Sequence, residues 1–331
     1  MKQKSQANLL ADQSFIGPLA AAVIVAIIVG FTTDKFWAFN NLNNIALAVS
    51  ITALIAIGAT LVIFIGGIDI SSGSMIALIT MAMANLIKMN GYPVWTGILL
   101  AIVLGGVLGA CNGFLTAYLR VPSFISTLAG ASIFKGFAFL LNGGSPIFSV
   151  APNFEFLFYG KLFNTIPLPF IYVAVFYFIF AGFMKYSRQG REIYAVGGNE
   201  SAARLSGINV KRVKLLTFVI AGIMAGFAAV LMASRLNSGS PNYGAGMEMS
   251  AIAAAVIGGA SLAGGRGSII NTLLGALTIV IVQNGLNLNA VNTSLQSITL
   301  GSIILFAVLL DMWKVEFSQI AKKVFRAQKQ L

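Results

Sequence analysis

The sequence predicts an all-α membrane protein, a polytopic transmembrane helical bundle, on three observations. Hydrophobic residues make up 58% of the 331 residues and charged residues only 9%, whereas soluble domains carry about 25% charged residues. Several apolar runs reach the roughly 20 residues that a helix needs to cross a bilayer. These runs are continuous and do not alternate, which favours helices over a barrel. We therefore expect a single transmembrane domain over residues 1–331.

Hydropathy and helix-breaking residues divide the chain into about ten spans. A polar start with Lys2 and Lys4 precedes the first span, which we expect to remain as an uncleaved membrane helix because further spans follow it. The third and eighth segments, and to a lesser extent the ninth, are short for a full crossing. The predicted spans are 15–31, 45–65, 74–87, 94–119, 122–141, 168–184, 215–232, 248–258, 268–284 and 294–312.

Basic residues indicate the orientation of this bundle. The formal net charge is +12, but the Lys and Arg residues are spread over separate loops and tails without interleaved aromatic residues, which excludes a nucleic-acid-binding surface. If the N-terminus is cytoplasmic, most of the 21 basic residues fall on the cytoplasmic side, including the segment 185–214 and the tail 313–331. The positive-inside rule therefore predicts that both termini are cytoplasmic.

Composition also limits the chemistry. The chain has no histidine and one cysteine, Cys111, so an internal disulfide, His-based metal sites and histidine-assisted nucleophiles are excluded. We expect no catalytic residue, no metal site and no cofactor bound by this chain. Charged residues at membrane depth are few, with Asp69 the acidic candidate and Lys135 the basic one. This scarcity disfavours ion-coupled transport.

The motif Gly-Gly-Ile-Asp-Ile-Ser-Ser-Gly-Ser at 66–74 interrupts a hydrophobic stretch. Asp69 and the serines that follow place polar groups at or near membrane depth, where irregular backbone must be buried in protein or line a cavity. Two interpretations stay open. The motif is either a broken helix at a translocation path or a docking surface, or it is a cytoplasmic turn in which Asp69 or Ser71 caps the next helix.

The segment 190–209 is a polar, glycine-punctuated loop between two spans. Asn199 is expected to cap a short helix over 201–206 that ends at Gly207, with a turn at Gly197-Gly198 before it. Such a capped helix suits the groove of a partner protein, and a plain solvated loop is the alternative. The predicted docking residues are Gly190, Arg191, Gly197, Gly198, Asn199, Glu200, Ala203, Leu205 and Gly207.

Other polar and glycine-rich segments complete the candidates. The segment 258–268 resembles a nucleotide-binding loop, but the required lysine is missing, so we expect a tight turn or re-entrant segment. Small residues over 105–109 and 221–226 are expected to bring helices together, with a glycine-lined path as the alternative. Polar loops at 142–148 and 233–249 either contact a solute or a delivery protein, or are plain turns. The candidates for the translocation path are Asp69, Ser71, Ser72, Asn112, Ser123, Phe124, Asn142, Asn284 and Asn287.

Taken together, the motifs at 66–74, 190–209, 252–268 and 284–288 resemble the membrane permease subunits of ribose-type sugar importers driven by ATP-binding-cassette (ABC) ATPases. They are spread over most of the chain, and their combination is specific although each alone is not. The resemblance implies a bundle like that of vitamin B12-type (type II) ABC importer permeases. The Ser71-Ser72 pair departs slightly from the commoner serine-valine pairing, and no Leu-Pro ending follows Gly207 as it would in maltose-type permeases.

The resemblance also implies the setting in which the chain works. It implies a second permease subunit, identical or closely related, a cytoplasmic ABC ATPase that binds ATP and Mg²⁺, and a periplasmic sugar-binding protein. The bacterial inner membrane is the implied location, and 190–209 is the implied ATPase-coupling segment. The alternative function is a stand-alone secondary transporter or channel for a small polar solute. An intramembrane enzyme is disfavoured because no catalytic dyad is present.

Overall fold

The computed structural model describes residues 2–309, with the backbone alone for residues 2–14. In this part of the chain, eight helical segments are long and apolar enough to cross a membrane, and the strands have two residues each. The elements are α1 (Lys2–Thr32), α2 (Phe39–Phe64), α3 (Ser72–Ala84), the π-helical turn η1 (Asn85–Met89), α4 (Val94–Ala117), α5 (Ser123–Leu140), β1 (Ile147–Phe148), α6 (Phe156–Tyr159), β2 (Lys161–Leu162), β3 (Ile166–Pro167), α7 (Leu168–Tyr186), α8 (Arg188–Gly198), α9 (Glu200–Leu205), α10 (Val210–Leu236), β4 (Ser238–Gly239), α11 (Met247–Ile257), α12 (Ile269–Leu288) and a last apolar helix, Thr293–Leu309.

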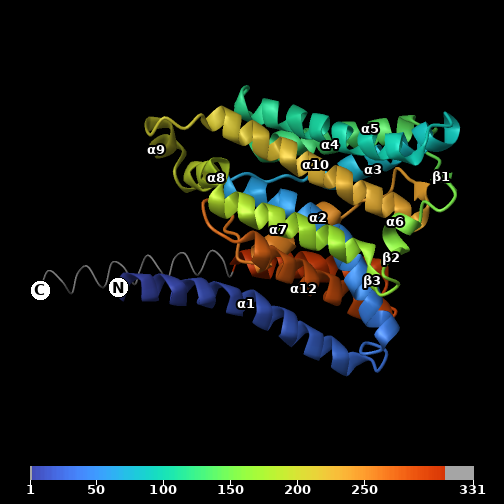
Figure 1. Ribbon diagram of the computed structural model, residues 1–331, viewed down its shortest axis with the longest axis horizontal. Helices are drawn as coiled ribbons and strands as arrows, with labels where there is room; N and C mark the ends of the chain where they lie inside the picture. The colour runs from blue at the N-terminus through green and yellow to red at the C-terminus, as the bar shows by residue number, and fades with distance from the viewer. Residues whose placement is uncertain (1, 310–331) are drawn as a thin grey trace, which may run out of the picture.

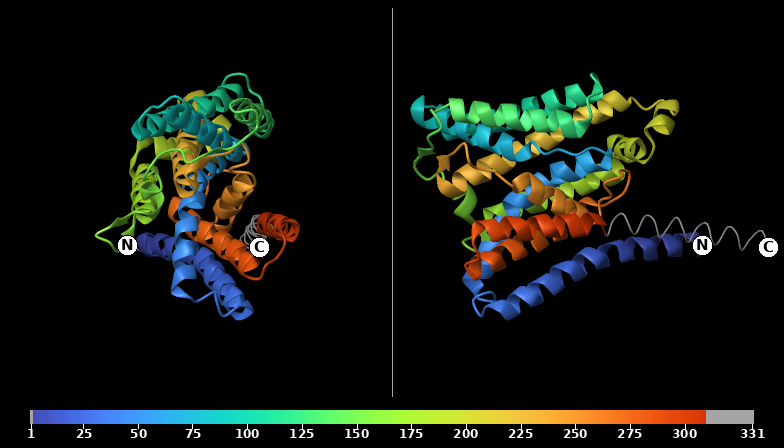
Figure 2. Two further views of the ribbon diagram at one scale, coloured as in Figure 1. Left: turned by 90° about the vertical axis from the view of Figure 1, so that its right-hand side faces the viewer. Right: turned by 180° about the vertical axis from the view of Figure 1, so that it is seen from behind.

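The long helices run side by side and give the bundle two distinct ends (Figure 1). One end carries α8, α9 and the beginning of α1, and we call it the α9 end. The other carries the short antiparallel pairs β1–β4 and β2–β3, and we call it the strand end. Figure 2 shows the same separation from behind. The beginning of α1 and the basic segment 185–214 thus lie at the same end, as the charge pattern predicts.

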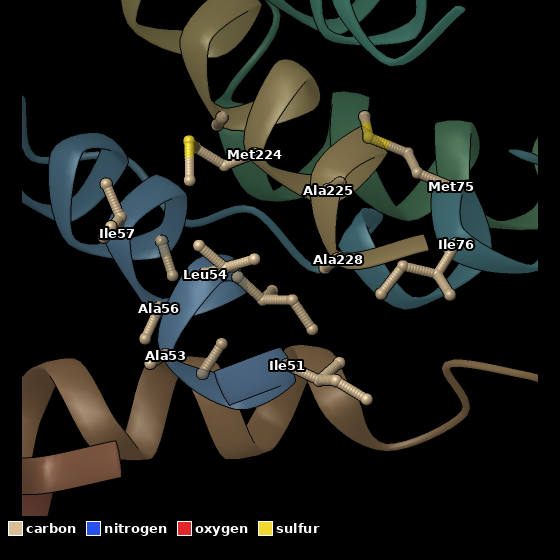
Figure 3. Packing of buried hydrophobic residues seen from close by; sticks show 14 of the residues in the cluster. Ile51, Ala53, Leu54, Ala56, Ile57, Met75, Ile76, Met224, Ala225 and Ala228 are labelled. Carbon is tan, nitrogen blue, oxygen red and sulfur yellow. The ribbon is translucent and has the colours of Figure 1, made fainter. Parts of the chain in front are cut away.

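Helix α2 is the centre of the core. Its residues from Ile51 to Phe64 are all buried, because α10, α11, α12, α7 and α3 pack around it. Figure 3 shows Leu54 and Ile57 of α2 near Met224 of α10, with Met75 of α3 beyond. A helix that is apolar on all sides is stable only when it is surrounded, so α2 is the element about which the other helices are arranged.

Glycines let α4 and α10 pack backbone against backbone, which confirms the predicted close helix packing. A Cβ on Gly105 would lie 2.3 Å from the carbonyl oxygen of Gly222, and one on Gly222 would lie 2.1 Å from that of Gly105. Gly109 meets the carbonyl oxygen of Phe218 in the same way, at 2.2 Å. Any larger side chain would push the two helices apart, as at other small-residue helix interfaces in membranes.

Two spans are discontinuous, and their helical parts begin next to each other inside the bundle. After α2, the segment 65–71 enters the bundle from the α9 end before α3 starts. After α10, the segment 237–246 returns from the strand end before α11 starts. The two starts meet at Gly73 and Gly244, where a Cβ on either residue would lie 2.3 Å from the carbonyl oxygen of the other. Irregular backbone at such depth is tolerated because protein surrounds it.

The predicted spans agree with the helices, with differences in length. The eighth is short, as expected, since α11 has 11 residues, but the third is not, because α3 and η1 together form the 18-residue apolar segment Ser72–Met89. The ninth is not short, since α12 has 20 residues. Helix α1 begins before the expected residue 15, and the tenth span corresponds to the helix Thr293–Leu309. The end of that span and the tail 313–331 lie outside the described residues.

Candidate coupling segment and translocation path

Three of the glycine-rich motifs meet at the α9 end around the carbonyl oxygen of Phe64, the last residue of α2. This oxygen accepts a hydrogen bond from the backbone N–H of Gly265 at 2.9 Å. A Cβ on Gly197 would lie 1.7 Å from the same oxygen and 2.6 Å from the Gly265 nitrogen. A Cβ on Gly264 would lie 2.9 Å from the backbone nitrogen of Gly66. The segment 190–209 is therefore seated on the motif at 66–74 and on the turn at 258–268.

Tyr194 of α8 reinforces this contact. Its hydroxyl donates to the carbonyl oxygen of Gly267 at 3.0 Å, and its ring lies 4.9 Å from the ring of Phe64, centroid to centroid. Burial raises the pKa of the Tyr194 phenol to about 12, so the hydroxyl keeps its proton and donates at neutral pH. Ile193 and Val196 are buried beside it, which fixes one face of α8 to the bundle.

The structure corrects the expected turn at Gly197-Gly198, because both glycines are the last residues of α8. Ser187 starts this helix by accepting the N–H of Gly190 at 2.9 Å. Gly190 itself lies so close to the end of α7 that a Cβ would be 2.6 Å from the carbonyl oxygen of Phe183. The polarity of the segment obscured the helix, whose buried face has few apolar residues.

The predicted short helix is confirmed as α9, beginning one residue earlier than expected. Asn199 caps it by accepting the backbone N–H of Ala202 at 2.9 Å. Gly207 has a positive φ of 82° and follows the last turn, where the N–H of Ile208 bonds to the carbonyl oxygen of Ala203 at 3.1 Å. This is the glycine-terminated ending typical of helices. Local capping signals of this kind are readable from sequence because they need no tertiary contact.

Glu200 ties α9 to the start of α10. Its carboxylate forms ion pairs with Lys214 at 2.7 Å and with Arg204 at 2.9 Å. The hydrogen bond from Lys214, followed by its charge and by the Arg204 contacts, lowers the pKa of Glu200 below its ordinary value, against a smaller opposing effect of burial. The carboxylate is thus ionised at neutral pH, and it holds α9 through charge rather than through apolar packing.

The outer face of α9 presents an apolar side chain to solvent. Ala203 is buried against the bundle, whereas the Leu205 side chain is 91% exposed. Arg191 on α8 donates to the carbonyl oxygen of Tyr186 at 3.1 Å and is also exposed. A leucine that is exposed on a fully capped helix is available to a partner protein, and it contributes nothing to the packing of this chain.

A cavity of about 680 Å³ lies beneath α9, and its lining includes one coupling candidate, Glu200, and one path candidate, Ser123. Glu200 and Lys214 line it on one side, and Gly67, Arg120 and Ser123 line it on the other. The Ser123 hydroxyl accepts the N–H of Ile68 at 3.1 Å. Phe124 is exposed on the next position of α5. Sequence reasoning selected Ser123 and Glu200 separately and gave no reason to place them at one cavity.

Asp69, Ser71 and Asn112 form a buried polar chain between the motif at 66–74 and α4. One carboxylate oxygen of Asp69 accepts the Ser71 backbone N–H at 2.8 Å and the Ser71 hydroxyl at 2.6 Å. The Asn112 amide then donates to the Ser71 hydroxyl at 2.8 Å. Asp69 is only 4% exposed. It therefore shapes the turn before α3 and links this turn to α4, but neither Asp69 nor Ser71 caps α3 with its side chain, so the predicted capping is wrong.

Three other path candidates lie toward the strand end, away from this chain. Asn284 and Asn41 exchange hydrogen bonds at 2.8 and 3.0 Å and join α12 to α2. Asn287 accepts a hydrogen bond from Gln296 at 3.0 Å, and Asn142 donates to the carbonyl oxygen of Ser145 at 2.9 Å. Each has a local partner, and the structure does not bring them together. Their role in a path remains a prediction.

Sequence reasoning missed several groups at these sites. Tyr194 gave no motif signal, and its partner Gly267 is far away in sequence. Glu248 falls where the predicted loop 233–249 and the predicted span 248–258 overlap, and the structure places it in the first turn of α11. Lys135 was noticed as a charged residue inside an apolar run, which is the usual signal of a functional group in a membrane span, but it was not placed with any partner.

The long apolar helices define a class of protein, a multi-pass membrane protein. The model of the family described as "Branched-chain amino acid transport system / permease component" matches residues 41–308. The chain belongs to this family.

Relatives agree with that membership. The chain is 40% identical over 304 residues to the ribose import permease protein RbsC of Bacillus subtilis, covering 90% of this chain and 93% of the relative. It is 38% identical over 302 residues to RbsC of Escherichia coli K12, covering 88% and 92%. It is 36% identical over 290 residues to the D-allose transport system permease protein AlsC of Escherichia coli K12, covering 88% and 89%. No solved structure matches the chain.

Proposed function

We propose that this protein is the membrane permease subunit of an ABC importer for a monosaccharide or a closely similar polar solute. The similarity to ribose and allose permeases over nearly the whole chain supports the substrate class. The observation that carries the proposal is α9, a short helix with both ends capped and Leu205 exposed, held at one end of the bundle. The alternative of a stand-alone secondary transporter is not favoured, since such a protein has no need of a docking helix.

The partners follow from this assignment. Two permease subunits, identical or closely related, would form the pathway in a bacterial inner membrane, with the α9 end in the cytoplasm. A cytoplasmic ABC ATPase, which binds ATP and Mg²⁺ in place of this chain, would receive α9. A periplasmic sugar-binding protein would deliver the solute at the strand end. The basic segment 185–214 at the α9 end supports this orientation through the positive-inside rule.

The contacts of α8 provide a route from the ATPase to the bundle. Movement of the ATPase would shift α9, and Asn199 joins α9 directly to α8. Helix α8 presses Gly197 against the end of α2 and bonds Tyr194 to the α11–α12 connection. Both discontinuous spans adjoin these contacts, since 65–71 follows α2 and the connection follows α11. A displacement at α9 can thus bias two states of the bundle without any reaction in this chain.

Reconstitution with defined components tests the proposal. Proteoliposomes that contain the permease, its genomically adjacent ABC ATPase and a sugar-loaded binding protein should take up the sugar only with ATP. The same permease without the ATPase should show no uptake under a proton or sodium gradient. Ion-driven uptake by the chain alone would overturn the assignment in favour of a secondary transporter.

A further inference from the structure

A second polar cavity lies between the start of α3, the middle of α5 and the start of α11, apart from the cavity under α9. Its volume is about 300 Å³, at the lower end of the roughly 300–1,000 Å³ found for ligand pockets. Two oppositely charged side chains and three hydroxyl groups line it. These residues are Lys135, Glu248, Ser74, Ser132 and Tyr243.

The cavity lies at the depth where the two discontinuous spans meet. Ser132 is the tenth residue of the 18-residue α5, so it lies about 14 Å along a helix of about 27 Å. Gly73 of α3 lets the Glu248 side chain of α11 approach the α3 backbone closely, because a Cβ on Gly73 would lie 2.0 Å from one carboxylate oxygen of Glu248. The absence of a side chain at Gly73 therefore makes room for this carboxylate.

The charged groups keep hydrogen-bonding capacity that the described chain does not use. One carboxylate oxygen of Glu248 accepts the Gly246 N–H at 3.3 Å, but the other is buried and has no partner among the described residues. Lys135 donates to the carbonyl oxygen of Pro241 at 2.5 Å, and an ammonium has three donors. The ion pairs of the described residues all lie within 188–214, so Lys135 and Glu248 do not neutralise each other by direct contact.

The cavity opens at the surface of the bundle beside Ser132 and Gly246, which are both exposed. At this depth the opening faces either lipid or another protein. Charged groups facing lipid are costly, and such groups almost always face a bundle interior or a water-filled cavity. The second permease subunit of the proposed function is the protein that would cover this side, leaving an aqueous space between the two copies.

We propose that Glu248 and Lys135 bind the hydroxyl groups of the sugar at the middle of its path through the membrane. The inference rests on the proposed function and adds the site at which the solute is held. The Glu248 carboxylate, which lines the cavity, accepts hydrogen bonds from sugar hydroxyls, and the Lys135 ammonium donates to their oxygens. Lys135 offsets part of the charge of Glu248, on which the carboxylate of Asp69 also acts, and the donor and acceptor together suit an uncharged polyol. The nearby serines add donors and acceptors of moderate strength, so the sugar is released easily.

Uptake by variants of the complete complex tests the site. The solute is the first of D-ribose, D-allose and D-xylose that the wild-type complex carries. Glu248→Gln and Lys135→Met should each lower its uptake about tenfold or more, since a hydrogen bond to a charged group is lost. ATPase activity stimulated by the binding protein should stay unchanged. The control variants Glu155→Gln and Lys161→Met alter the same residue types at exposed positions of the strand end and should transport normally.

The possible results distinguish failure of the proposed sugar site from failure of the proposed permease function. Normal uptake by both pocket variants would overturn the site while leaving the permease function intact. Parallel loss of uptake, ATPase stimulation and complex yield would show that these residues hold the fold, which also overturns the site. If the wild-type complex moves none of the three sugars, the proposed function fails first and the sugar site fails with it. If uptake by the wild-type complex requires an ion gradient and the Glu248→Gln variant loses that requirement, Glu248 serves ion coupling and the sugar site is overturned.

A labelling experiment tests the site without relying on the charged variants. In a Cys111→Ala background, Ser132→Cys should react with a membrane-impermeant thiosulfonate reagent, because the cavity is predicted to hold water. Saturating sugar should slow that reaction severalfold. Ile179→Cys, on the exposed face of α7, should not react and serves as the control. Failure of Ser132→Cys to react, or reaction without protection by sugar, would contradict the proposal.

Discussion

Gly197 lies so close to Phe64 that a Cβ on the glycine would stand 1.7 Å from the phenylalanine carbonyl oxygen. This contact joins the peripheral helices to the central helix of the bundle, with no side chain between them. The same carbonyl oxygen accepts the N–H of Gly265, so three segments share one point. Changes at this point should therefore affect the permease as a whole, more than changes at neighbouring glycines.

Gly197→Ala should disrupt this contact. The added methyl group cannot be accommodated against two backbone atoms, so α8 must move away from α2. We expect transport to fall at least tenfold, with a lower melting temperature, because overpacking of this kind costs about 1–3 kcal/mol or more. Gly198→Ala is the matched control, since nothing lies within 4 Å of its Cβ position. Equal behaviour of the two variants in a thermal-shift and uptake comparison would refute the contact.

Leu205→Asp should uncouple the ATPase from the permease without unfolding the bundle. The side chain is exposed, so its loss leaves the fold intact, but a charge replaces the apolar group offered to the partner. We expect the ATPase to be lost on co-purification and uptake to fall about tenfold or more, as for a central interface residue. Ser201→Asp, which adds the same charge on α9 at another exposed position, is the control. Normal uptake and co-purification of Leu205→Asp would contradict the docking role.

The ion pair of Glu200 with Lys214 predicts a pH dependence of α9. Because the pKa of Glu200 is lowered, the pair stabilises α9 above the ordinary carboxyl pKa of 4.5, and this stabilisation is lost as the pH falls through the lowered pKa. Lys214→Met should shift the loss to higher pH. Limited proteolysis of the 199–209 segment between pH 3 and 7 measures the shift. Arg212→Met is the control, because it changes a nearby charge without removing this pair.

Glu200→Lys should loosen α9 more than Lys214→Met does. The new ammonium would face Arg204 and Lys214 at the positions where both now meet a carboxylate. Exposed pairs contribute only about 0–1 kcal/mol, so we expect increased cleavage and weaker ATPase binding while the melting temperature of the bundle stays nearly constant. A double variant, Glu200→Lys with Lys214→Glu, should restore protection. Failure of this charge exchange to restore any protection would argue against the pair.

Tyr194→Phe should remove one hydrogen bond while keeping the ring against Phe64. The Gly267 carbonyl then lacks its donor, and we expect a loss of about 0.5–1.5 kcal/mol in the stability of the α9 end. The Tyr194 pKa of about 12 in the folded protein also predicts the direction of a pH effect on stability. Ionisation of tyrosine in the unfolded chain begins to lower stability above pH 10, and the variant should lack this contribution. Hydrogen exchange of α8 amides at pH 7 and pH 10.5 distinguishes the two proteins.

The sequence anticipated features that depend on local chemistry. Asn199 and Gly207 delimit α9 because a capping side chain and a positive φ are properties of single positions. The long spans followed from hydropathy, and the small faces of α4 and α10 followed from residue size. Helix α8 could not be predicted because only two large apolar residues, Ile193 and Val196, form its buried face, and most of the surrounding residues are polar.

Tertiary relationships could not be read from spacing. Nothing in the order of residues places Gly197 against Phe64, or Glu248 beside Gly73, since each pair is separated by more than a hundred positions. Asp69 stands out in the sequence as a charged residue in an apolar region, yet its contacts with Ser71 and, through Ser71, with Asn112 cannot be predicted from spacing. The path candidates Asn142, Asn284 and Asn287 were chosen by polarity alone, and their local partners were not predictable.

The backbone contact between α4 and α10 has a mechanical consequence for any conformational cycle. Because the backbones of Gly105 and Gly222 are in direct contact, no side chain lies between the helices that could rotate and let them slide. We therefore expect α4 and α10 to move together as one rigid body. The hinges of the cycle are then expected in the non-helical segments 65–71 and 237–246, which lie next to this pair of helices.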